Sequence, residues 1–383
     1  MKIIDKTIHK LSESIRNVLL IQLGDIGDLV WTTPSIRAVK KSIPDSKVSL
    51  LVQEGFASLL EADPSIDGIL EVKRPYGSLF HQMVRQLLFL KDIRFRHFDL
   101  AVDLRLGDRG AFMAFATGAP MRVTLYHPEG LPFWRNFLFS HGVVPGVPVY
   151  TCGAAEQSLG ILRGLGIDTD DAVPQLWISD DTRRCVREIL VREILVREKA
   201  NGFRQCISIN PFSRWSYKEW NPDRWIEIIN WLWRDFSIPV FVIGSRDELP
   251  KVDALIRRCD ARPFNFAGKT TLAELAGLLS LSRLHIGVDS AAPHIAAAVG
   301  TPTVTIYGPS SWKDWAPPGE NHRVILPKMN CVPCHQKGCN GSGRSQCLDE
   351  LDSDQVKSVV CEMIEKSPVR HEQTLMNHFH QDK

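Results

Sequence analysis

The first candidate for catalytic chemistry is a pair of carboxylates in the segment 23–34, LGDIGDLVWTTP. Asp25 and Asp28 lie there in a glycine-containing turn that follows an apolar run. A carboxylate in such a turn is suited to act as a general base, whereas two negative charges would repel a pyrophosphate bound directly there. The spacing is GDxGD and not GxGxxG, so no dinucleotide fingerprint is present. The alternative is that Asp28 only caps the helix that follows.

The second candidate is a cationic loop within residues 210–225, NPFSRWSYKEWNPDRW. It carries Ser213, Arg214 and Lys218, with aromatic residues between them. Guanidinium and ammonium groups beside a hydroxyl suit the recognition of a diphosphate. The alternative is a surface loop whose cations are only solvated.

The third candidate, residues 287–310, joins the end of an apolar run to a stretch of small residues. Asp289 and Ser290 end the run, and one of them is expected to cap a helix that begins at Ala291. The exposed N–H groups and the dipole of that helix predict an anion site. His294 lies one turn further on, where a structural role and a ligand-binding role are about equally expected.

The fourth candidate is a cysteine cluster in residues 331–347 with the spacing C-x2-C-x4-C-x7-C. Its members are Cys331, Cys334, Cys339 and Cys347. Four thiolates in one loop are suited to tetrahedral zinc or iron, in a structural and not a catalytic role. The alternative is a reduced structural loop or a pair of local disulfides.

Apolar runs that alternate with helical patterns must position these groups. Strands are predicted at 18–23, 48–52, 68–72, 100–104, 206–210, 240–244, 284–288 and 303–308. Helices are predicted at 31–41, at 78–93 and after Asn221, where Pro222 would occupy the first helical position. Alternation of this kind predicts parallel βαβ units and an α/β fold with one sheet in each half of the chain.

The chain is expected to divide into two domains with short appendages. The predicted boundaries are an N-terminal extension at 1–16, domains at 17–175 and 176–366, and a disordered tail at 367–383. Near the boundary, residues 186–199 contain a five-residue tandem repeat, VREILVREILVREK. Its residues favour a solvent-exposed helix.

Composition excludes several classes of protein. The chain has 383 residues, 23% charged and 44% hydrophobic, with a formal net charge of +2. This balance is typical of a soluble globular protein and too neutral for nucleic acid as the main partner. No apolar run reaches the roughly 18–20 residues of a membrane span, and the polar start does not resemble a signal peptide. A cytoplasmic protein is therefore expected.

Taken in order, the candidate segments resemble glycosyltransferase family 9, the ADP-heptose:lipopolysaccharide heptosyltransferases, from about residue 17 to 365. The resemblance lies in GDxxxTxP at 27–34, SRWxxKxW at 213–220 and GVDSxxxH at 287–294. It implies a GT-B fold, in which two Rossmann-like domains face each other across a cleft. It also implies inverting, metal-independent transfer of heptose from ADP-heptose to a lipopolysaccharide core.

The resemblance also implies roles for individual residues. Asp28 would be the general base in an N-terminal domain that binds the acceptor. The C-terminal domain would bind the donor through Ser213, Arg214, Lys218, Asp289, Ser290, Ala291 and His294. Asp247 or Glu248, which follow the strand at 240–244, would contact the nucleotide ribose.

The acceptor side departs from the family pattern at Asp25, where many relatives carry a small or hydroxyl residue. Asp25 would tune the base or contact the acceptor. Basic residues of the first domain would face an anionic lipid-linked acceptor, and they are Lys73, Arg74, Arg105, Arg109 and Arg122. Of these, Arg105 and Arg109 are the strongest acceptor-side candidates. The enzyme would then act at the cytoplasmic face of the inner membrane, through a basic or amphipathic patch.

Three alternative functions stay open at the level of sequence. A protein heptosyltransferase would keep the fold and use its cysteine loop for iron. A non-catalytic nucleotide-sugar-binding protein would not need Asp28, Lys218 and Asp289 together. A nicotinamide dehydrogenase is disfavoured because GxGxxG is missing after the first predicted strand of each half.

Overall fold

The computed structural model describes residues 1–5, 15–74, 77–105, 107–126, 134–144, 146, 153–195 and 206–366. The chain forms two compact units. The first is Met1–Ser179 with Lys313–Ala316, and the second is Asp180–Trp312 with Pro317–Lys383. The division after Ser179 lies a few residues beyond the predicted boundary at 175, and the first unit also takes in a short segment of the second half.

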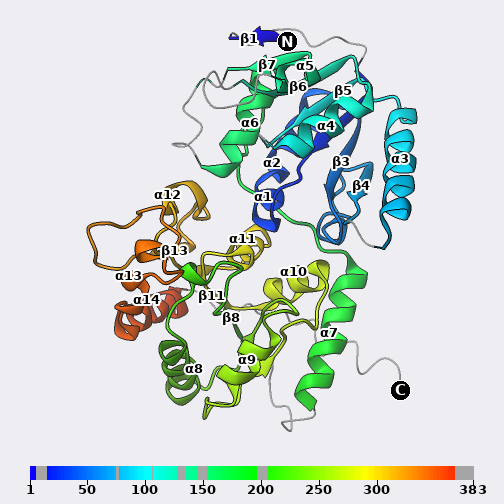
Figure 1. The fold of residues 1–383 in the computed structure, drawn as a ribbon. Coiled ribbons are helices and arrows are strands. Elements are labelled where there is room, and N and C mark those ends of the chain that lie inside the picture. The colour runs from blue at the N-terminus through cyan, green and yellow to red at the C-terminus, as the bar shows by residue number, and fades with distance from the viewer. Residues whose placement is uncertain are drawn as a thin grey trace, which may run out of the picture. The chain divides into compact units, whose positions relative to one another are not determined.

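The first unit contains a seven-stranded parallel sheet in the order β1-β7-β6-β5-β2-β3-β4 (Figure 1). Its strands are β1 (Lys2–Ile4), β2 (Asn17–Ile21), β3 (Lys47–Gln53), β4 (Gly68–Val72), β5 (Leu100–Asp103), β6 (Met121–Leu125) and β7 (His141–Val143). The four strands predicted in this half are confirmed as β2 to β5. Their apolar runs are buried because helices cover both faces of a parallel sheet.

Three strands of this sheet were not predicted. β1 pairs with β7 in parallel register, Lys2 opposite His141, so residues 2–4 belong to the sheet and are not part of an extension. β6 (MRVTL) includes Arg122 and Thr124, and β7 (HGV) has only three residues, so neither gives a continuous apolar run. Such strands are recognised by their pairing and not by their composition.

The second unit contains a six-stranded parallel sheet in the order β10-β9-β8-β11-β12-β13. Its strands are β8 (Ile207–Asn210), β9 (Val240–Val242), β10 (Phe264–Asn265), β11 (Leu284–Val288), β12 (Thr303–Ile306) and β13 (His322–Ile325). The four predicted strands are confirmed as β8, β9, β11 and β12, and β10 and β13 were missed.

Helices connect the strands in both units. In the first they are α1 (Ile26–Trp31), α2 (Thr33–Ser42), α3 (Leu79–Phe95), α4 (Asp108–Thr117), α5 (Arg135–Leu138) and α6 (Ala154–Gly164). The others are α7 (Asp180–Leu195), α8 (Pro222–Phe236), α9 (Leu249–Ile256), α10 (Leu272–Leu281), α11 (Ala291–Ala298), α12 (Trp312–Trp315), α13 (Gln346–Asp349) and α14 (Ser353–Lys366). None of the helices in the described residues is long and apolar enough to cross a membrane.

The repeat at 186–199 forms the later part of α7 and is only partly described. Val186 and Leu190, one turn apart, are buried. A Cβ at Gly277 of α10 would approach the Val186 side chain to 2.9 Å, so the two helices are in close contact. The predicted helix is therefore exposed on one side only. The predicted disordered tail at 367–383 lies outside the described residues.

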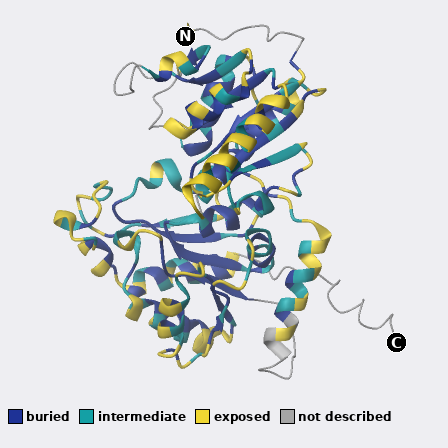
Figure 2. Ribbon diagram, turned by 45° about the vertical axis from the view of Figure 1, so that its right-hand side comes forward, coloured by how far each residue is buried: buried dark blue, intermediate teal, exposed yellow. Residues whose placement is uncertain are grey.

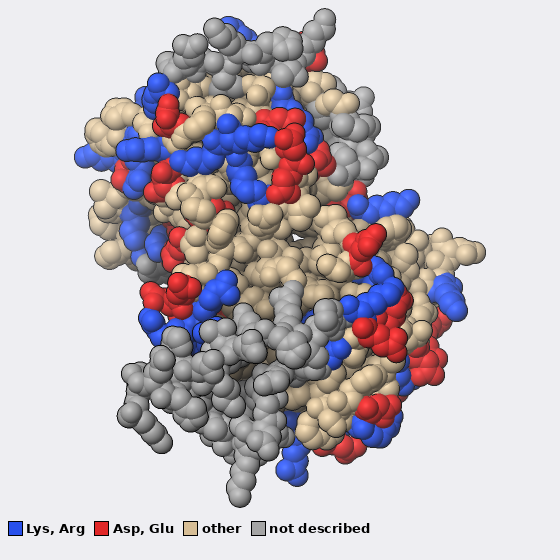
Figure 3. Space-filling view, turned by 180° about the vertical axis from the view of Figure 1, so that it is seen from behind, with Lys and Arg blue, Asp and Glu red and all other residues tan. Residues whose placement is uncertain are grey.

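Each unit has its own apolar core (Figure 2). In the second unit the core lies between strands and the helices α8 and α14, and Trp220 and Trp225 meet there edge to face with 5.0 Å between ring centroids. Cationic and anionic side chains are interspersed on the face drawn in Figure 3. Neither sign dominates that face, in agreement with the formal net charge of +2 for the whole chain.

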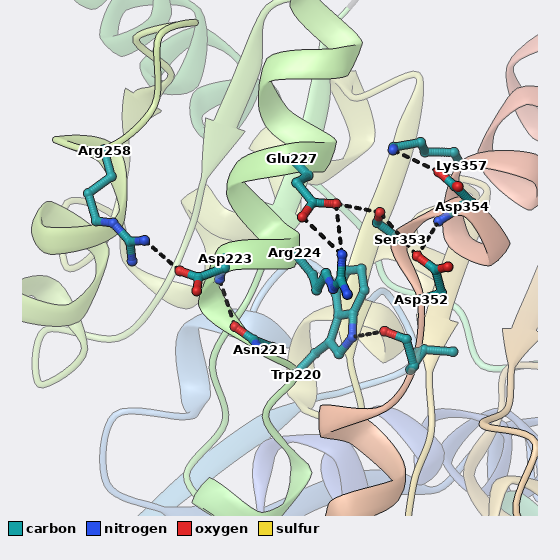
Figure 4. A network of polar contacts seen from close by, with 11 residues as sticks. Trp220, Asn221, Asp223, Arg224, Glu227, Arg258, Asp352, Ser353, Asp354 and Lys357 are labelled. Atoms are coloured by element: carbon teal, nitrogen blue, oxygen red, sulfur yellow. Dashed lines mark hydrogen bonds and ion pairs between the residues drawn. The ribbon is translucent and has the colours of Figure 1, made fainter.

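Polar contacts fix the N-terminal end of α8 against the C-terminal segment (Figure 4). The predicted cap is confirmed, because the Asn221 side chain accepts a hydrogen bond from the Asp223 N–H at 2.9 Å. Glu227 of α8 is linked to Arg224 on the same helix and to Ser353 at the start of α14. The loop that precedes α8 is therefore held at a defined position.

Candidate functional site

The first site centres on Asp28, which lies in the first turn of α1 just past the carboxyl end of β2. Its Oδ2 accepts a hydrogen bond from the Asp25 N–H at 2.8 Å and forms an ion pair with the guanidinium of Arg105. Arg105 follows β5, the strand that neighbours β2 in the sheet. Asp25 and Asp28 form a capping box, so the expected capping role is also present.

The electrostatics of Asp28 suit a group that exchanges a proton. Burial raises the pKa of its carboxyl, and the charge of Arg105 partly offsets this rise. The side chain is 20% exposed, so a ligand can still reach it. Both of these contacts are made by Oδ2, so Oδ1 is the oxygen that is available to an incoming hydroxyl.

Gly24 makes the contact between Asp28 and Arg105 possible. A Cβ at this position would collide with the Arg105 guanidinium and with the Asp28 carboxylate. Two glutamines hold the turn, since Gln22 accepts from the Gly24 N–H at 3.1 Å and Gln53 donates to the Gly24 carbonyl at 2.7 Å. The turn therefore brings the side chains of Asp28 and Arg105 together, which is not the arrangement of a phosphate-binding loop.

A buried ion pair that the sequence did not reveal supports the same edge of the sheet. Asp103 at the end of β5 lies 3.3 Å from Arg135, and both side chains are almost fully buried. Burial raises the pKa of Asp103, and the charge of Arg135 partly offsets this rise. Its Oδ1 accepts from the Arg105 N–H at 3.3 Å, which fixes the backbone that presents Arg105.

Of the other two acceptor-side candidates, Asp25 contacts Asp28 through its backbone N–H, and Arg109 lies elsewhere. Asp25 is the N-cap of α1. Arg109 is exposed and donates to the Lys73 carbonyl at 3.5 Å, near the end of β4. The structure thus brings Asp28 and Arg105 together and leaves Arg109 at the outer side of the same sheet edge.

The second site centres on an ion pair between Lys218 and Asp289. The Lys218 Nζ lies 2.7 Å from the Asp289 Oδ2, with 22% of the lysine and 7% of the aspartate side chain exposed. Lys218 comes from the loop after β8 and Asp289 from the end of β11, the neighbouring strand. The two segments, which the sequence presents as separate candidates, therefore meet at the carboxyl edge of one sheet.

The start of α11 lies directly beside this ion pair. Ser290 occupies the N-cap position but makes no side-chain cap, because its hydroxyl donates to Asn210 Oδ1 at 2.6 Å. Ser290 therefore occupies the predicted N-cap position, but the prediction that its side chain caps the helix is wrong. The first turn of α11 receives no side-chain cap from Ser290, and a helix start of this kind beside a lysine is suited to an anion.

Two buried side chains complete the surroundings of Asp289. Burial lowers the pKa of His294 to about 4, so its imidazole is neutral at pH 7 and can bind a ligand only as a neutral hydrogen-bonding group. Tyr307 was not singled out from the sequence. Its hydroxyl is fully buried without a partner in the described residues, and burial together with the charge of Asp289 raises its pKa.

The remaining candidates of the second site have mixed outcomes. Ser213 is buried and donates to the Asp289 carbonyl at 3.4 Å, so it joins the site. Arg214 is exposed and lies over the Trp215 ring, 5.5 Å from its centroid. Glu248 accepts from the Ser245 N–H at 2.7 Å after β9, whereas Asp247 is exposed.

The four cysteines of residues 331–347 carry free thiols. Burial, followed by the neighbouring Cys331, Cys334 and Cys339, raises the pKa of Cys347 to about 11. Among the described residues, which include all four, no three side chains of the ligand types converge as a metal site. As they stand, the thiols do not fit a tetrahedral ion, and the zinc or iron site stays a prediction.

The end of the cysteine segment and the residues just after it hold the Lys218 loop in place. The buried Ser345 hydroxyl donates to the Tyr217 carbonyl at 2.6 Å, and Ser216 donates to the Gly343 carbonyl at 3.0 Å. The Trp220 indole donates to the Leu351 carbonyl at 3.1 Å, as Figure 4 shows. These contacts span some 130 residues of sequence, so no local pattern could reveal them.

A family model matches most of this chain. The model of glycosyltransferase family 9 (heptosyltransferase) matches residues 87–343. Lipopolysaccharide heptosyltransferase 3 of Escherichia coli (strain K12) is 29% identical over 299 residues, which are 77% of this chain and 83% of that protein.

Solved structures share the fold at low sequence identity. A family 9 glycosyl transferase from Veillonella parvula DSM 2008 gives a TM-score of 0.78 at 19% identity, covering 94% of this chain and all of that one. E. coli heptosyltransferase WaaC with ADP-2-deoxy-2-fluoro heptose gives 0.67 at 17% identity, covering 90% and 99%. The iron-containing dodecameric glycosyltransferase TibC of enterotoxigenic E. coli gives 0.54 at 16% identity, covering 95% and 78%.

Proposed function

The chain belongs to glycosyltransferase family 9, and from this premise we propose that it transfers a heptose from ADP-heptose to a lipopolysaccharide core acceptor with inversion. It is a glycosyltransferase with the predicted GT-B fold. The proposal for donor and acceptor draws on the names of its relatives, a lipopolysaccharide heptosyltransferase and a WaaC structure with an ADP-heptose analogue. We place the reaction in the cytoplasm, where a nucleotide sugar would be available.

In the proposed mechanism the carboxylate of Asp28 takes the proton from an acceptor hydroxyl. The hydroxyl oxygen then attacks the anomeric carbon, and the bond from that carbon to the diphosphate oxygen breaks, releasing ADP. The raised pKa of Asp28 supports this role, because a stronger base removes a hydroxyl proton more readily. Attack from the face opposite the leaving group inverts the anomeric centre.

Lys218 and the first-turn amides of α11 would stabilise the negative charge that develops on the departing diphosphate. The observation that carries this assignment is the Lys218–Asp289 ion pair beside an uncapped helix start. Asp289 holds the lysine in place in the absence of donor and would contact hydroxyl groups of the donor sugar. The neutral imidazole of His294 adds no charge to the site.

The test is release of ADP from ADP-L-glycero-D-manno-heptose with and without deep-core lipopolysaccharide. We expect release that depends on the acceptor. Donor binding without release on any core acceptor would contradict the proposal and favour a protein hydroxyl as acceptor, which a peptide substrate would reveal.

Gly24→Ala should impair turnover more than folding. The new methyl group would separate Asp28 from Arg105 and displace the base, and a shift of about 1 Å can cost up to about a hundredfold in rate. We expect at least a tenfold loss of kcat, with the thermal midpoint lowered by only a few degrees. Gly107→Ala is the matched control, because a Cβ there meets nothing within 4 Å.

Ser345→Ala should raise the KM for the donor severalfold. It removes the hydrogen bond to Tyr217, one residue before Lys218, and costs about 1 kcal/mol of stability. Ser345→Thr keeps the hydroxyl and should restore KM. Ser342→Ala removes a hydroxyl that contacts only Arg344 and should change nothing. An unchanged KM in Ser345→Ala would show that the segment does not position the lysine.

A further inference from the structure

The long helix α3 exposes an unusual amount of apolar surface. The side chains of Leu79, Phe80, Met83, Leu87, Leu88 and Phe95 are between 58% and 84% exposed. Residues 80, 83, 84, 87 and 88 follow the i, i+3, i+4, i+7, i+8 spacing that places side chains on one face of a helix. Surfaces of this kind on soluble proteins usually mark a site of interaction.

The opposite side of α3 makes the contacts that pack this helix against the core of the first unit. Ile93 is its only buried residue, and Phe89 and Leu90 pack at the edge of the core of the first unit. Figure 2 shows exposed residues along most of this helix. The apolar face is therefore not needed for folding of the unit and is left without a partner in the described residues.

Cations follow this face along the helix. Lys91 and Arg94 lie one and two turns beyond Leu87, and both are exposed, with the Arg94 guanidinium lying against Gly118 at the end of α4. The Lys91 ammonium lies 5.7 Å from the centroid of the Phe95 ring, as expected for a long side chain that keeps its charge at the border of an apolar surface. Asp92, the one acidic residue of the helix, is paired with Arg96.

The position of α3 relates this face to Asp28 within the same unit. The helix begins a few residues after β4, so its N-terminal half lies toward the carboxyl edge of the sheet. Asp28 after β2 and Arg105 after β5 lie at that edge. Arg109 at the start of α4 reaches the Lys73 carbonyl at the end of β4, which ties this part of the edge together.

We infer that α3 is an interfacial helix that docks the first unit on an anionic lipid bilayer, with its apolar side chains in the acyl boundary and the Lys91 ammonium at the headgroups. Apolar residues interleaved with cations match such a surface, whereas the face of an obligate protein interface is depleted in lysine. The inference deepens the proposed function, because a lipid-linked acceptor would then be held near Asp28.

The test is sedimentation of the full chain with vesicles of phosphatidylglycerol and phosphatidylethanolamine, compared with phosphatidylcholine alone. We expect binding to the anionic vesicles that weakens with added salt. The double variant Phe80→Glu with Leu87→Glu should lose at least about tenfold in vesicle affinity. The control, Val173→Glu with Trp177→Glu, adds the same charge at exposed apolar residues of this unit outside α3 and should bind as wild type.

Two further outcomes separate this inference from its alternatives. Vesicle binding needs no substrate, and turnover of a delipidated core oligosaccharide needs no membrane. Failure of the first measurement therefore contradicts the role of α3, whereas failure of the second contradicts the proposed function. The α3 double variant should keep that turnover within about twofold of wild type, because none of its changes touches Asp28 or Arg105. Absence of vesicle binding by wild type, or self-association in solution that the double variant abolishes, would overturn the inference.

Discussion

Replacing Asp28 by Asn is expected to lower kcat by about two to four orders of magnitude while donor affinity stays unchanged. The substitution removes the carboxylate that we propose as the proton acceptor. It keeps an amide oxygen for the hydrogen bond from the Asp25 N–H, so the start of α1 should be preserved. Acceptor-dependent ADP release, donor titration and thermal unfolding measured together will separate chemistry from folding.

The matched control is Asp25→Asn, which neutralises the adjacent carboxylate at the N-cap. Because asparagine is as good an N-cap as aspartate, we expect folding to be preserved and kcat to fall by less than about tenfold. An equal loss in both variants would mean that the turn as a whole, and not the proton acceptor, was disturbed.

The pH profile offers a second measure of the same assignment. A base must be ionised, so kcat/KM should fall as the pH drops through the pKa of Asp28, which burial holds above the ordinary value of 3.8. Arg105 lowers this pKa, so Arg105→Gln should move the acidic limb to higher pH. The limb should vanish in Asp28→Asn. A limb that does not move in Arg105→Gln would show that another group is the base.

The strands that the sequence predicts consist mostly of apolar residues, most of which are buried in the fold. Runs such as VLLI at 18–21 are buried on both faces, as is typical of strands of a covered sheet. The strand at Lys2–Ile4 has no such signal, because two of its three residues are exposed and its place depends on pairing with His141–Val143. Edge strands are fixed by their neighbour, which lies far away in the sequence.

The residues of the candidate site also divide into those that the sequence predicts and those that only the folded chain reveals. Asp28, Lys218 and Asp289 could be singled out because each lies in the segment that follows a predicted strand, and ligands of α/β proteins bind at the carboxyl ends of parallel strands. The pairing of Lys218 with Asp289 and the support of Arg105 by Asp103 are contacts over 71 and 2 residues that depend on side-chain geometry. The unpaired hydroxyl of Tyr307 is invisible in sequence, since burial is a property of the folded chain.

Lys218→Met is expected to lower kcat/KM for the donor by about two to three orders of magnitude. A charged donor aimed at a developing oxyanion contributes on the order of 3–4 kcal/mol, and here the loss has a second part. Asp289, 7% exposed, would be left as an unpaired buried carboxylate that repels the diphosphate. Steady-state kinetics and donor titration will measure both effects, and Lys218→Arg should retain part of the activity because it keeps the charge.

Lys251→Met serves as the control, because that lysine also pairs with a carboxylate of this unit, Glu219, but is half exposed. Exposed pairs contribute little, so stability and turnover should change only slightly. The decisive variant is Lys218→Met combined with Asp289→Asn. If the unpaired carboxylate causes part of the loss, the second substitution should recover stability and some donor affinity but not kcat, since the cation that stabilises the leaving diphosphate is still missing. Additive losses in the double variant would instead show that Lys218 and Asp289 act on the donor independently.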